Sequence, residues 1–481
     1  MSDRVDNELA MLLRHTRRRP SSRACIDHHD HRWWTWADLA IEVWRYAVAP
    51  IPGTSKDSGT PARWVHLCEN AVSDLAVSLA CTATGRVDVP IDRRLHPRQR
   101  HRLEEVVGPI VDIRPAHPMD SLDEAVDGLT ELEHSIDADA DSLILWTSGT
   151  TAHPRGVRLS QRNLTSNARG KLVAVPQGCT DRRSTVLPIC HAYARTCDVG
   201  TWLVSGGQLS LGLGCRELPT GDGPFRPTHI NTVPSIARAI AEAIRSGDSA
   251  WRDLRVLGCG GAAIPQGLLD QFADFNIDVI QGYGLTETSP VISSARVRPR
   301  SAWRTPRRAG TVGPPIPDCQ IKTAEQRLLV RGPNVMNGYL DDPVATRERI
   351  DENGWLDTGD LVEIDSDGEL RILGRSDDVI VMPNGYKVHP HAIESLVQAL
   401  DGVEHAVVVR NGNQLLVAVQ GDRRRQERIE QVGSSAIPPG TQLGIAWIDP
   451  PLEGDELTIK ETPRREVVAR RFQTPSNGDE P

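Results

Sequence analysis

The segment from Trp64 to Asp92 constrains the fold most, because it is predicted to form a strand, a helix and a second strand. WVHLCEN and RVDVPID are typical of strands, and AVSDLAVSLACTATG is typical of a helix that Gly85 ends as a C-cap. A helix that connects two strands in this way leaves them parallel and covers one face of their sheet. We therefore expect a parallel sheet flanked by helices.

Strands and helices continue to alternate along the chain. Residues 32–46 read as a short strand followed by an amphipathic helix, and Leu143 to Trp146 read as a buried strand. Further strands are predicted at 184–189, 208–213, 227–233, 254–259 and 278–281, with helices at 197–205, 235–245 and 265–275. The acidic segment 120–141 is predicted to be a surface connection. This alternation is typical of an α/β domain.

A chain of 481 residues is too long for one compact core, so two or more domains are expected. From about Thr311 the sequence becomes β-rich, with a hairpin loop predicted at 365–368. Beyond Arg375, a helix at 390–400 and a strand at 405–409 indicate a smaller α+β unit, with a loop at 421–440 and a disordered tail at 474–481. We predict a large α/β domain over residues 1–374, with parallel helix-flanked sheets and a β-rich subdomain, and a small α+β domain over 375–481.

The composition excludes several classes of protein. A net charge of −9 argues against a nucleic-acid-binding protein. Nine scattered cysteines without C-x-x-C pairs favour reduced thiols and a cytoplasmic location. The sequence predicts no membrane span and no signal peptide, because no apolar run approaches the required length. Arginine carries nearly all the positive charge, so the few lysines deserve separate inspection: Lys56, Lys171, Lys322, Lys387 and Lys460.

A loop rich in Thr, Ser and Gly follows the strand that ends at Trp146. Its small residues allow backbone N–H groups and hydroxyls to converge on phosphate oxygens, and Arg155 and Gly156 close it with a positive charge. The usual G-x-x-x-x-G-K-[ST] phosphate loop is absent. An ordinary surface turn has the same composition, so the loop is informative only together with motifs further along the chain.

Four separated stretches occur in one order. They are the loop 146–157, QGYGLTETSP at 281–290, GWLDTGDL at 354–361 and LGRSDDVIVMPNGYKVHPHAIE at 373–394. Together they resemble the adenylate-forming (AMP-binding) superfamily, which includes acyl- and aryl-CoA ligases, peptide-synthetase adenylation domains and luciferases. The stretches LPICHAYAR at 187–195 and LLVRGPNVMNGY at 328–339 look most like fatty acyl-CoA synthetases of the long-chain type.

The resemblance implies that a carboxylate and ATP give an acyl-adenylate and pyrophosphate, and that the acyl group then passes to CoA. It implies ATP and Mg²⁺ as requirements, CoA as co-substrate and a small carboxylic acid, expected to be a fatty acid. No general base is needed, since a carboxylic acid is already ionised at pH 7. The first step needs charge neutralisation and alignment at the α-phosphate instead.

The resemblance also assigns the phosphate loop. The residues implied to hold the β- and γ-phosphates are Thr147, Ser148, Gly149, Thr150, Thr151 and Arg155, with Gly156 closing the loop. The family usually has Gly where Ala152 stands and Lys where Arg155 stands. Arginine keeps the charge, whereas Ala152 restricts the backbone.

The second and central motifs are implied to bind the nucleotide. Tyr283, beside Gly284, is expected to stack on adenine, Thr286 to bond a phosphate oxygen and Glu287 to bind Mg²⁺. Small residues expected to line the adenine pocket are Gly260, Gly261 and Ala262. A glycine-rich turn with a capping Glu, and glycines that pack a strand–helix corner, are the structural alternatives.

The remaining roles concern the ribose, the hinge and the thioester step. The resemblance implies that Asp360 binds the ribose hydroxyls, that Arg375 reaches the ribose or α-phosphate, and that Asp377 is the hinge of a mobile C-terminal domain. His191 is in the position of a gate residue near the acyl pocket, and Lys387 in that of a basic residue used in thioester formation. Turn, surface-pair and structural roles are the alternatives for these residues.

The final family motif departs from the pattern. It usually contains a Lys, just after a Gly, that contacts substrate during adenylation. Here the stretch reads ELTIKETPRREVV, and the candidate Lys460 lies one or two positions early without the preceding Gly. The leading hypothesis is therefore an ATP-dependent acid–CoA ligase, with two alternatives: an enzyme that loads an acyl carrier protein, and a non-catalytic nucleotide-binding relative.

Overall fold

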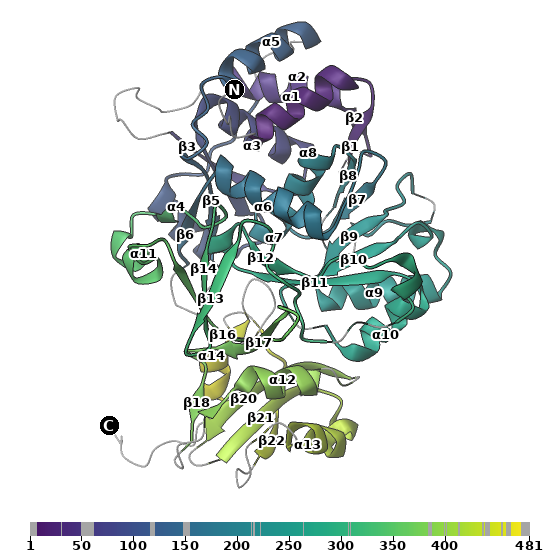
Figure 1. Ribbon diagram of the computed structural model, residues 1–481, viewed down its shortest axis with the longest axis vertical. Coiled ribbons are helices and arrows are strands. Elements are labelled where there is room, and N and C mark those ends of the chain that lie inside the picture. The colour runs from purple at the N-terminus through teal and green to yellow at the C-terminus, as the bar shows by residue number, and fades with distance from the viewer. Residues whose placement is uncertain are drawn as a thin grey trace.

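The computed structural model describes residues 7–472 except 30, 50–61, 116–120, 148–153, 213, 215, 216, 222, 263, 306, 308, 383–386, 399, 401, 412, 413, 435, 436, 438–442, 454, 455 and 458–462. Figure 1 shows three sheets of the long N-terminal part stacked with their helices, and the C-terminal part as a compact body at one end of the molecule. Within the described residues, no helix is both long and apolar enough to cross a membrane.

The largest sheet has eight strands in the order β12-β11-β10-β9-β7-β8-β1-β2. Its strands are β1 (Arg23–Asp27), β2 (Trp33–Thr35), β7 (Arg182–Thr185), β8 (Gln208–Leu211), β9 (His229–Thr232), β10 (Val256–Cys259), β11 (Asp278–Gly284) and β12 (Val291–Ser294). All neighbours are parallel except the two edge strands β2 and β12. The predicted parallel sheet is confirmed, and its antiparallel edges are an addition.

The second sheet contains the strand–helix–strand unit predicted from the sequence. Its order is β15-β6-β5-β4-β3, formed by β3 (Arg63–Cys68), β4 (Val87–Asp92), β5 (Asp141–Trp146), β6 (Gly156–Ser160) and β15 (Gly338–Tyr339). Helix α3 (Val72–Thr84) joins the parallel strands β3 and β4, and Gly85 ends it with φ +66°. β5 and β6 form an antiparallel hairpin with Trp146 opposite Gly156, so the predicted phosphate loop is the loop of this hairpin.

Helices cover both sheets (Figure 1). They are α1 (Glu8–Arg18), α2 (Trp36–Ala47), α4 (Pro97–Val107), α5 (Leu122–Glu133), α6 (Gln161–Ala174), α7 (Ala192–Ala194), α8 (Thr201–Ser205), α9 (Pro234–Arg245), α10 (Gln266–Asp274) and α11 (Pro343–Arg349). The predicted helix 197–205 begins with a π-helical turn, Arg195–Gly200, before α8.

The surface connection predicted at 120–141 is wrong, because this segment contains helix α5. Ser121 caps the helix, and Ala125 and Leu129 are fully buried. A Cβ on Gly128 would overlap the Trp44 side chain of α2 at 2.3 Å. The acidic residues of α5 lie around a narrow apolar stripe, which is why composition suggested a loop.

A four-stranded antiparallel sheet forms the β-rich subdomain, with the order β13-β14-β16-β17. Its strands are β13 (Gln320–Ala324), β14 (Arg327–Arg331), β16 (Leu356–Ile364) and β17 (Leu370–Arg375). β16 and β17 are joined through residues 365–368, as the sequence predicted. Arg375, the last residue of β17, lies opposite Asp360 of β16.

The C-terminal part has its own apolar core, in which Ile393, Val408, Val417 and Ile429 are fully buried. It is built from β18 (Ile380–Val381), β19 (Lys387–Val388), β20 (Val403–Asn411), β21 (Gln414–Gly421), β22 (Leu443–Trp447), α12 (Pro390–Gln398), α13 (Gln426–Ser434) and α14 (Arg465–Arg470). The loop predicted at 421–440 is wrong in its centre, since α13 buries Ile429 there. The predicted disordered tail lies outside the described residues.

Candidate active site

A cavity of about 280 Å³ lies at the carboxyl ends of β5, β10 and β11. Beyond these strands come Thr147, Gly260 and the turn Thr286–Thr288. Ligands of open α/β sheets bind at this end of the strands, because the loops that follow them are free to carry chemistry. The position of the cavity therefore follows from the fold.

Many residues predicted from the sequence meet in this cavity. Those that line it are Thr147, His191, Gly260, Gly261, Tyr283, Gly284, Thr286, Glu287 and Arg375. The predicted Ser148, Gly149, Thr150, Thr151 and Lys460, and the departure Ala152, lie outside the described residues. Segments separated by more than 200 positions in the sequence thus contribute to one site.

Tyr283, Asp360 and Arg375 form a connected group on one side of the cavity. The Tyr283 hydroxyl donates a hydrogen bond to Oδ2 of Asp360, and Arg375 Nη1 lies 3.6 Å from Oδ1 of the same carboxylate. Burial raises the pKa of Asp360, whereas the hydrogen bond from Tyr283 and the charge of Arg375 act in the opposite direction. Arg375 also contacts Asp377, whose Oδ1 lies 3.1 Å from its Nε. A phenol ring and a guanidinium therefore line the cavity, and the Asp360 carboxylate behind them contacts both.

Glu287 also lines the cavity, and its carboxylate is held by a tyrosine. The Tyr339 hydroxyl donates a 2.8 Å hydrogen bond to Oε1 of Glu287, which is 8% exposed and lines the cavity. Burial and the Glu287 charge raise the pKa of Tyr339, so this hydroxyl remains a donor at neutral pH. A buried carboxylate with one anchored oxygen fits a hard divalent cation such as Mg²⁺, which binds through one or two protein carboxylates together with phosphate oxygens.

Arg155 and Gly156 lie at the start of β6, on the second side of the β5–β6 hairpin. The Arg155 guanidinium lies 5.3 Å from the centre of the Tyr339 ring, and its Nε lies 3.8 Å from Oδ2 of Asp342. The Arg155 backbone N–H donates to Oγ1 of Thr147 at 3.1 Å, which closes the base of the loop. Gly156 is packed, since a Cβ there would lie 3.1 Å from both Ile144 and Leu340. Arg155 thus lies beside the tyrosine that anchors Glu287.

Three other predicted residues have different surroundings. Nε2 of His191 lies 3.3 Å from Oδ2 of the buried Asp92, and the His191 ring borders the cavity. Ala262 is exposed and does not line the cavity. Lys387 is exposed on the β18–β19 hairpin, where it pairs with Val381, and the cavity does not include it.

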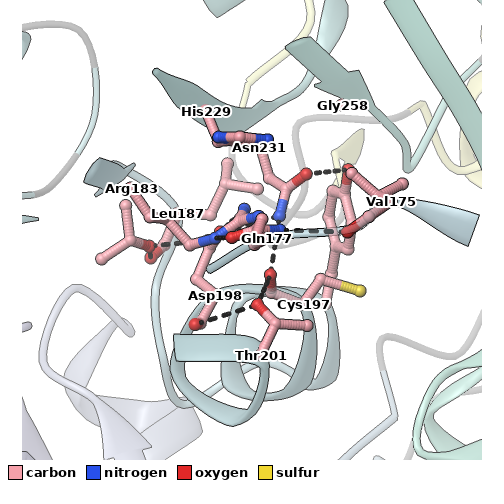
Figure 2. Close-up of polar contacts among 12 residues, drawn as sticks. Val175, Gln177, Arg183, Leu187, Cys197, Asp198, Thr201, His229, Asn231 and Gly258 are labelled. Carbon is pink, nitrogen blue, oxygen red and sulfur yellow. Dashed lines mark hydrogen bonds and ion pairs between the residues drawn. The ribbon is translucent and has the colours of Figure 1, made fainter. Parts of the chain in front are cut away.

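A buried polar network supports the cavity wall at the π-helical turn (Figure 2). Arg183 Nη1 and Asn231 Nδ2 donate to Oδ1 of Asp198 at 2.8 and 2.7 Å. The Thr185 hydroxyl donates to Oδ2 of Asp198 at 2.9 Å. The Tyr193 hydroxyl donates to Oδ1 of Asn231 at 3.3 Å, and the Tyr193 ring lines the cavity. The network fixes the wall because every link in it is buried or half-buried.

The sequence assigned no role in the site to three residues that matter for the cavity. Tyr339 anchors Glu287, and Arg349 lines the cavity while its Nη2 donates to the Thr358 carbonyl at 2.8 Å. Lys171 also lines the cavity. The scarcity of lysine was the one available signal for Lys171.

Comparison with known proteins agrees with this geometry. The ATP-bound crystal structure of MatB from Rhodopseudomonas palustris has a TM-score of 0.76 and 21% sequence identity, over 97% of this chain and 99% of that one. The two chains therefore share their fold over nearly their whole length. The profile of the AMP-binding enzyme family matches residues 12–340, and the chain belongs to this family.

Two relatives indicate the breadth of the family around this chain. A feruloyl-CoA synthase from Amycolatopsis is 29% identical over 422 residues, which is 82% of this chain and 84% of that protein. A long-chain-fatty-acid–CoA ligase from Escherichia coli O157:H7 is 29% identical over 297 residues, or 56% and 50% of the two chains. The predicted adenylate-forming enzyme is confirmed, and the relatives include proteins named for an aromatic and for an aliphatic acid.

Proposed function

We propose that the protein is an ATP-dependent acid–CoA ligase, which converts a carboxylate and ATP into an acyl-adenylate and pyrophosphate and then transfers the acyl group to CoA. The convergence of Tyr283, Arg375 and Glu287 on one cavity, with Asp360 bonded to Tyr283 and 3.6 Å from Arg375, carries the proposal. The names of its relatives, feruloyl-CoA synthase and long-chain-fatty-acid–CoA ligase, support the same reaction class.

Adenylation requires positive charge around a phosphate while an ionised carboxylate attacks it. Arg375 and Arg349 both border the cavity and can neutralise charge as the pyrophosphate leaves. Thr286 can donate a hydrogen bond to a phosphate oxygen, and Asp360 can accept from the ribose hydroxyls. No proton has to be removed from the acid, so the site works by alignment and charge.

Glu287 is the residue proposed to hold Mg²⁺. A bound Mg²⁺ supplies positive charge to phosphate oxygens when present. Tyr339 keeps the carboxylate oriented and leaves its second oxygen for this purpose. Ser148, Gly149, Thr150 and Thr151 are proposed to complete the phosphate site, and Lys460 to contact the substrates during adenylation.

The second half-reaction is proposed to involve rotation of the small domain after Arg375. Ser376 N–H donates to the Gly359 carbonyl at 2.8 Å, which ties this position to the β-rich sheet, and Asp377 follows as the proposed hinge. Lys387 lies outside the cavity in this arrangement, as expected for a residue used only after rotation. Transfer to an acyl carrier protein is the alternative second step.

The proposed acid is largely hydrophobic, because Leu187, Ala192, Val233 and Val291 supply apolar surface to the cavity. The sequence motifs favour a fatty acid, with an aromatic acid as the alternative. His191 is proposed to border the entrance to this region. A cytoplasmic location fits the reaction, and the described cysteines are free thiols.

Mass spectrometry of reaction mixtures tests the proposal. The enzyme, ATP, Mg²⁺ and an acid should give the acyl-adenylate, and addition of CoA should convert it to the acyl-CoA thioester. An adenylate that accumulates in the presence of CoA, but disappears on addition of a phosphopantetheinylated carrier protein, would favour the alternative second step. ATP binding without any adenylate would contradict the enzyme proposal.

A further inference from the structure

Lys171 lies in helix α6, and its side chain forms part of the cavity wall. It is 6% exposed, and its Nζ donates a 2.7 Å hydrogen bond to Oγ of Ser294 in β12. An ammonium has three N–H donors, and in the described part of the chain Lys171 forms no ion pair. Within the described residues, a buried cation with one hydrogen bond to its three donors therefore borders the cavity.

Among the described residues, no neighbouring acidic group forms an ion pair with Lys171, and the effect of Asp198 is opposed by Arg183. Asp198 accepts hydrogen bonds from Arg183 and Asn231 at Oδ1 and from Thr185 at Oδ2, and its charge is paired with Arg183. Cys197 also lines the cavity, but burial raises the pKa of its thiol to about 11, so the thiol is neutral at pH 7. The partner that would balance Lys171 is thus not supplied by the cavity wall around it.

The strand register indicates which end of the cavity Lys171 occupies. Its partner Ser294 pairs with Gly282, whereas Thr286 and Glu287 follow the end of β11. Each strand residue advances the chain by about 3.3 Å, so Ser294 lies deeper along the sheet than the proposed phosphate-binding residues. Cys197 and Val291 also line the cavity, and Val291 is one of the apolar residues proposed to contact the acid.

We propose that Lys171 determines acid specificity, and that the preferred acid carries an oxygen acceptor, such as a carboxylate or hydroxyl, at the end remote from the activated carboxylate. This inference rests on the proposed acid–CoA ligase function and narrows its substrate class. The carbon chain of the acid is hydrophobic and contacts the apolar side chains of the cavity. The oxygen at its far end accepts a hydrogen bond from the Lys171 ammonium.

The physical reason is the cost of leaving a buried charge without a partner. Burial lowers the pKa of Lys171 to about 8, which leaves it mostly protonated at pH 7. A methyl group in contact with the Lys171 ammonium excludes water from it and accepts no hydrogen bond. An oxygen at the same place accepts a charge-assisted hydrogen bond, which is about twice as strong as a neutral one.

The test compares acids that differ only at the far end. Acyl-adenylate formation is measured as kcat/KM with dicarboxylic acids of four to ten carbons against monocarboxylic acids of equal length, and with 4-hydroxycinnamic against cinnamic acid. Wild-type enzyme is expected to prefer the oxygen-bearing member of its best pair by about 10- to 100-fold. Lys171→Met should reduce that preference to within about threefold, chiefly by losing the oxygen-bearing acid.

Matched variants separate an effect on acid specificity from an effect on folding. Lys322→Met makes the same change at an exposed lysine whose Nζ lies over Trp355, and it should leave the preference unchanged. Lys171→Gln keeps a neutral donor, so it should lose preference for a second carboxylate while binding ATP normally. Lys171→Met removes a desolvated charge, and its melting temperature should not fall.

The outcomes distinguish the inference from the function on which it rests. Activity with methyl-ended acids that equals or exceeds activity with their oxygen-bearing partners, unchanged by Lys171→Met and Lys171→Gln, overturns the inference alone. ATP binding without adenylation of any acid overturns the ligase function, and the inference with it.

Discussion

The Tyr339 hydroxyl donates a 2.8 Å hydrogen bond to Oε1 of Glu287, and the two residues come from stretches 52 positions apart. Glu287 is the carboxylate proposed to bind Mg²⁺, so the hydrogen bond from Tyr339 fixes the orientation of that carboxylate. Arg155 lies over the Tyr339 ring, so the β5–β6 hairpin contacts the residue that holds Glu287.

Tyr339→Phe should therefore weaken the response to Mg²⁺ without unfolding the protein. Loss of a residue that orients a metal ligand typically costs 10- to 100-fold in metal affinity or activity, so the Mg²⁺ concentration for half-maximal adenylation should rise by about tenfold. The measurement is a Mg²⁺ titration of adenylate formation. Tyr46→Phe, in the buried core of α2, is the control, and equal Mg²⁺ curves for both variants would contradict this role.

Gly284→Ala should disrupt the turn that carries Tyr283 and Thr286. A Cβ at Gly284 would lie 1.7 Å from the Pro290 carbonyl oxygen, so the backbone must move. We expect adenylation to fall by at least about tenfold, since small displacements of reacting groups are costly. Gly267→Ala is the matched control, because nothing lies within 4 Å of its added Cβ in α10. An active Gly284→Ala enzyme would show that the turn tolerates the shift.

The buried pair between Arg195 and Glu8 should govern stability. Arg195 Nη1 and Nη2 bond the two Glu8 carboxylate oxygens at 2.6 and 2.5 Å, and both residues are less than 5% exposed. Glu8→Ala leaves a buried guanidinium without a partner and should destabilise the protein by about 3–5 kcal/mol. Thermal unfolding checks this, with Glu8→Leu combined with Arg195→Leu as a comparison. A double variant less stable than Glu8→Ala would contradict the explanation.

The Lys171 inference also predicts a pH dependence. Below pH about 8 Lys171 is an ammonium, and above it the charge is lost, so the kcat/KM preference for an oxygen-ended acid should fall as pH rises through about 8. The charged or titratable groups that influence Lys171, namely Cys197, Arg183, Asp198 and Arg307, act on both acids of a matched pair. The ratio measured from pH 6.5 to 9.5 should be flat in Lys171→Met. A flat ratio in wild type as well would exclude the ammonium as its cause.

Much of this architecture was accessible from the sequence. The βαβ unit around α3 and the strands β8 to β11 follow local periodicity and glycine positions, so they were predicted with small boundary errors. Strands β1 and β6 were not predicted, and the strand predicted at 184–189 overlaps β7 only at 184–185. Helix α5 and helix α13 were missed because each buries only a few residues within a charged segment. Their burial depends on partners distant in the sequence, such as Trp44 for Gly128, and no local pattern records this.

The site residues also fall into those that could be predicted from the sequence and those that could not. Tyr283, Glu287 and Asp360 stand within motifs that recur in a family, so their positions could be predicted. Tyr339 and Arg349 act through contacts made only after α11 and β16 pack beside the cavity. Lys171 lies within helix α6, outside the four motifs, and only the packing of β12 places Ser294 against it. Tertiary contact, which sequence periodicity does not encode, therefore determines which polar residues reach the cavity.

The most direct test of the ligase function is acid-dependent exchange of labelled pyrophosphate into ATP, with wild-type enzyme and Glu287→Gln. Removal of a preorganised charge at the transferring phosphate typically costs about 10²–10³-fold. We predict exchange that requires a particular class of acid and that falls by this amount in Glu287→Gln, while ATP binding without Mg²⁺ is retained. Absence of exchange with every acid, in a wild-type protein that binds ATP, would contradict the account and leave a nucleotide-binding protein with the fold of an adenylate-forming enzyme.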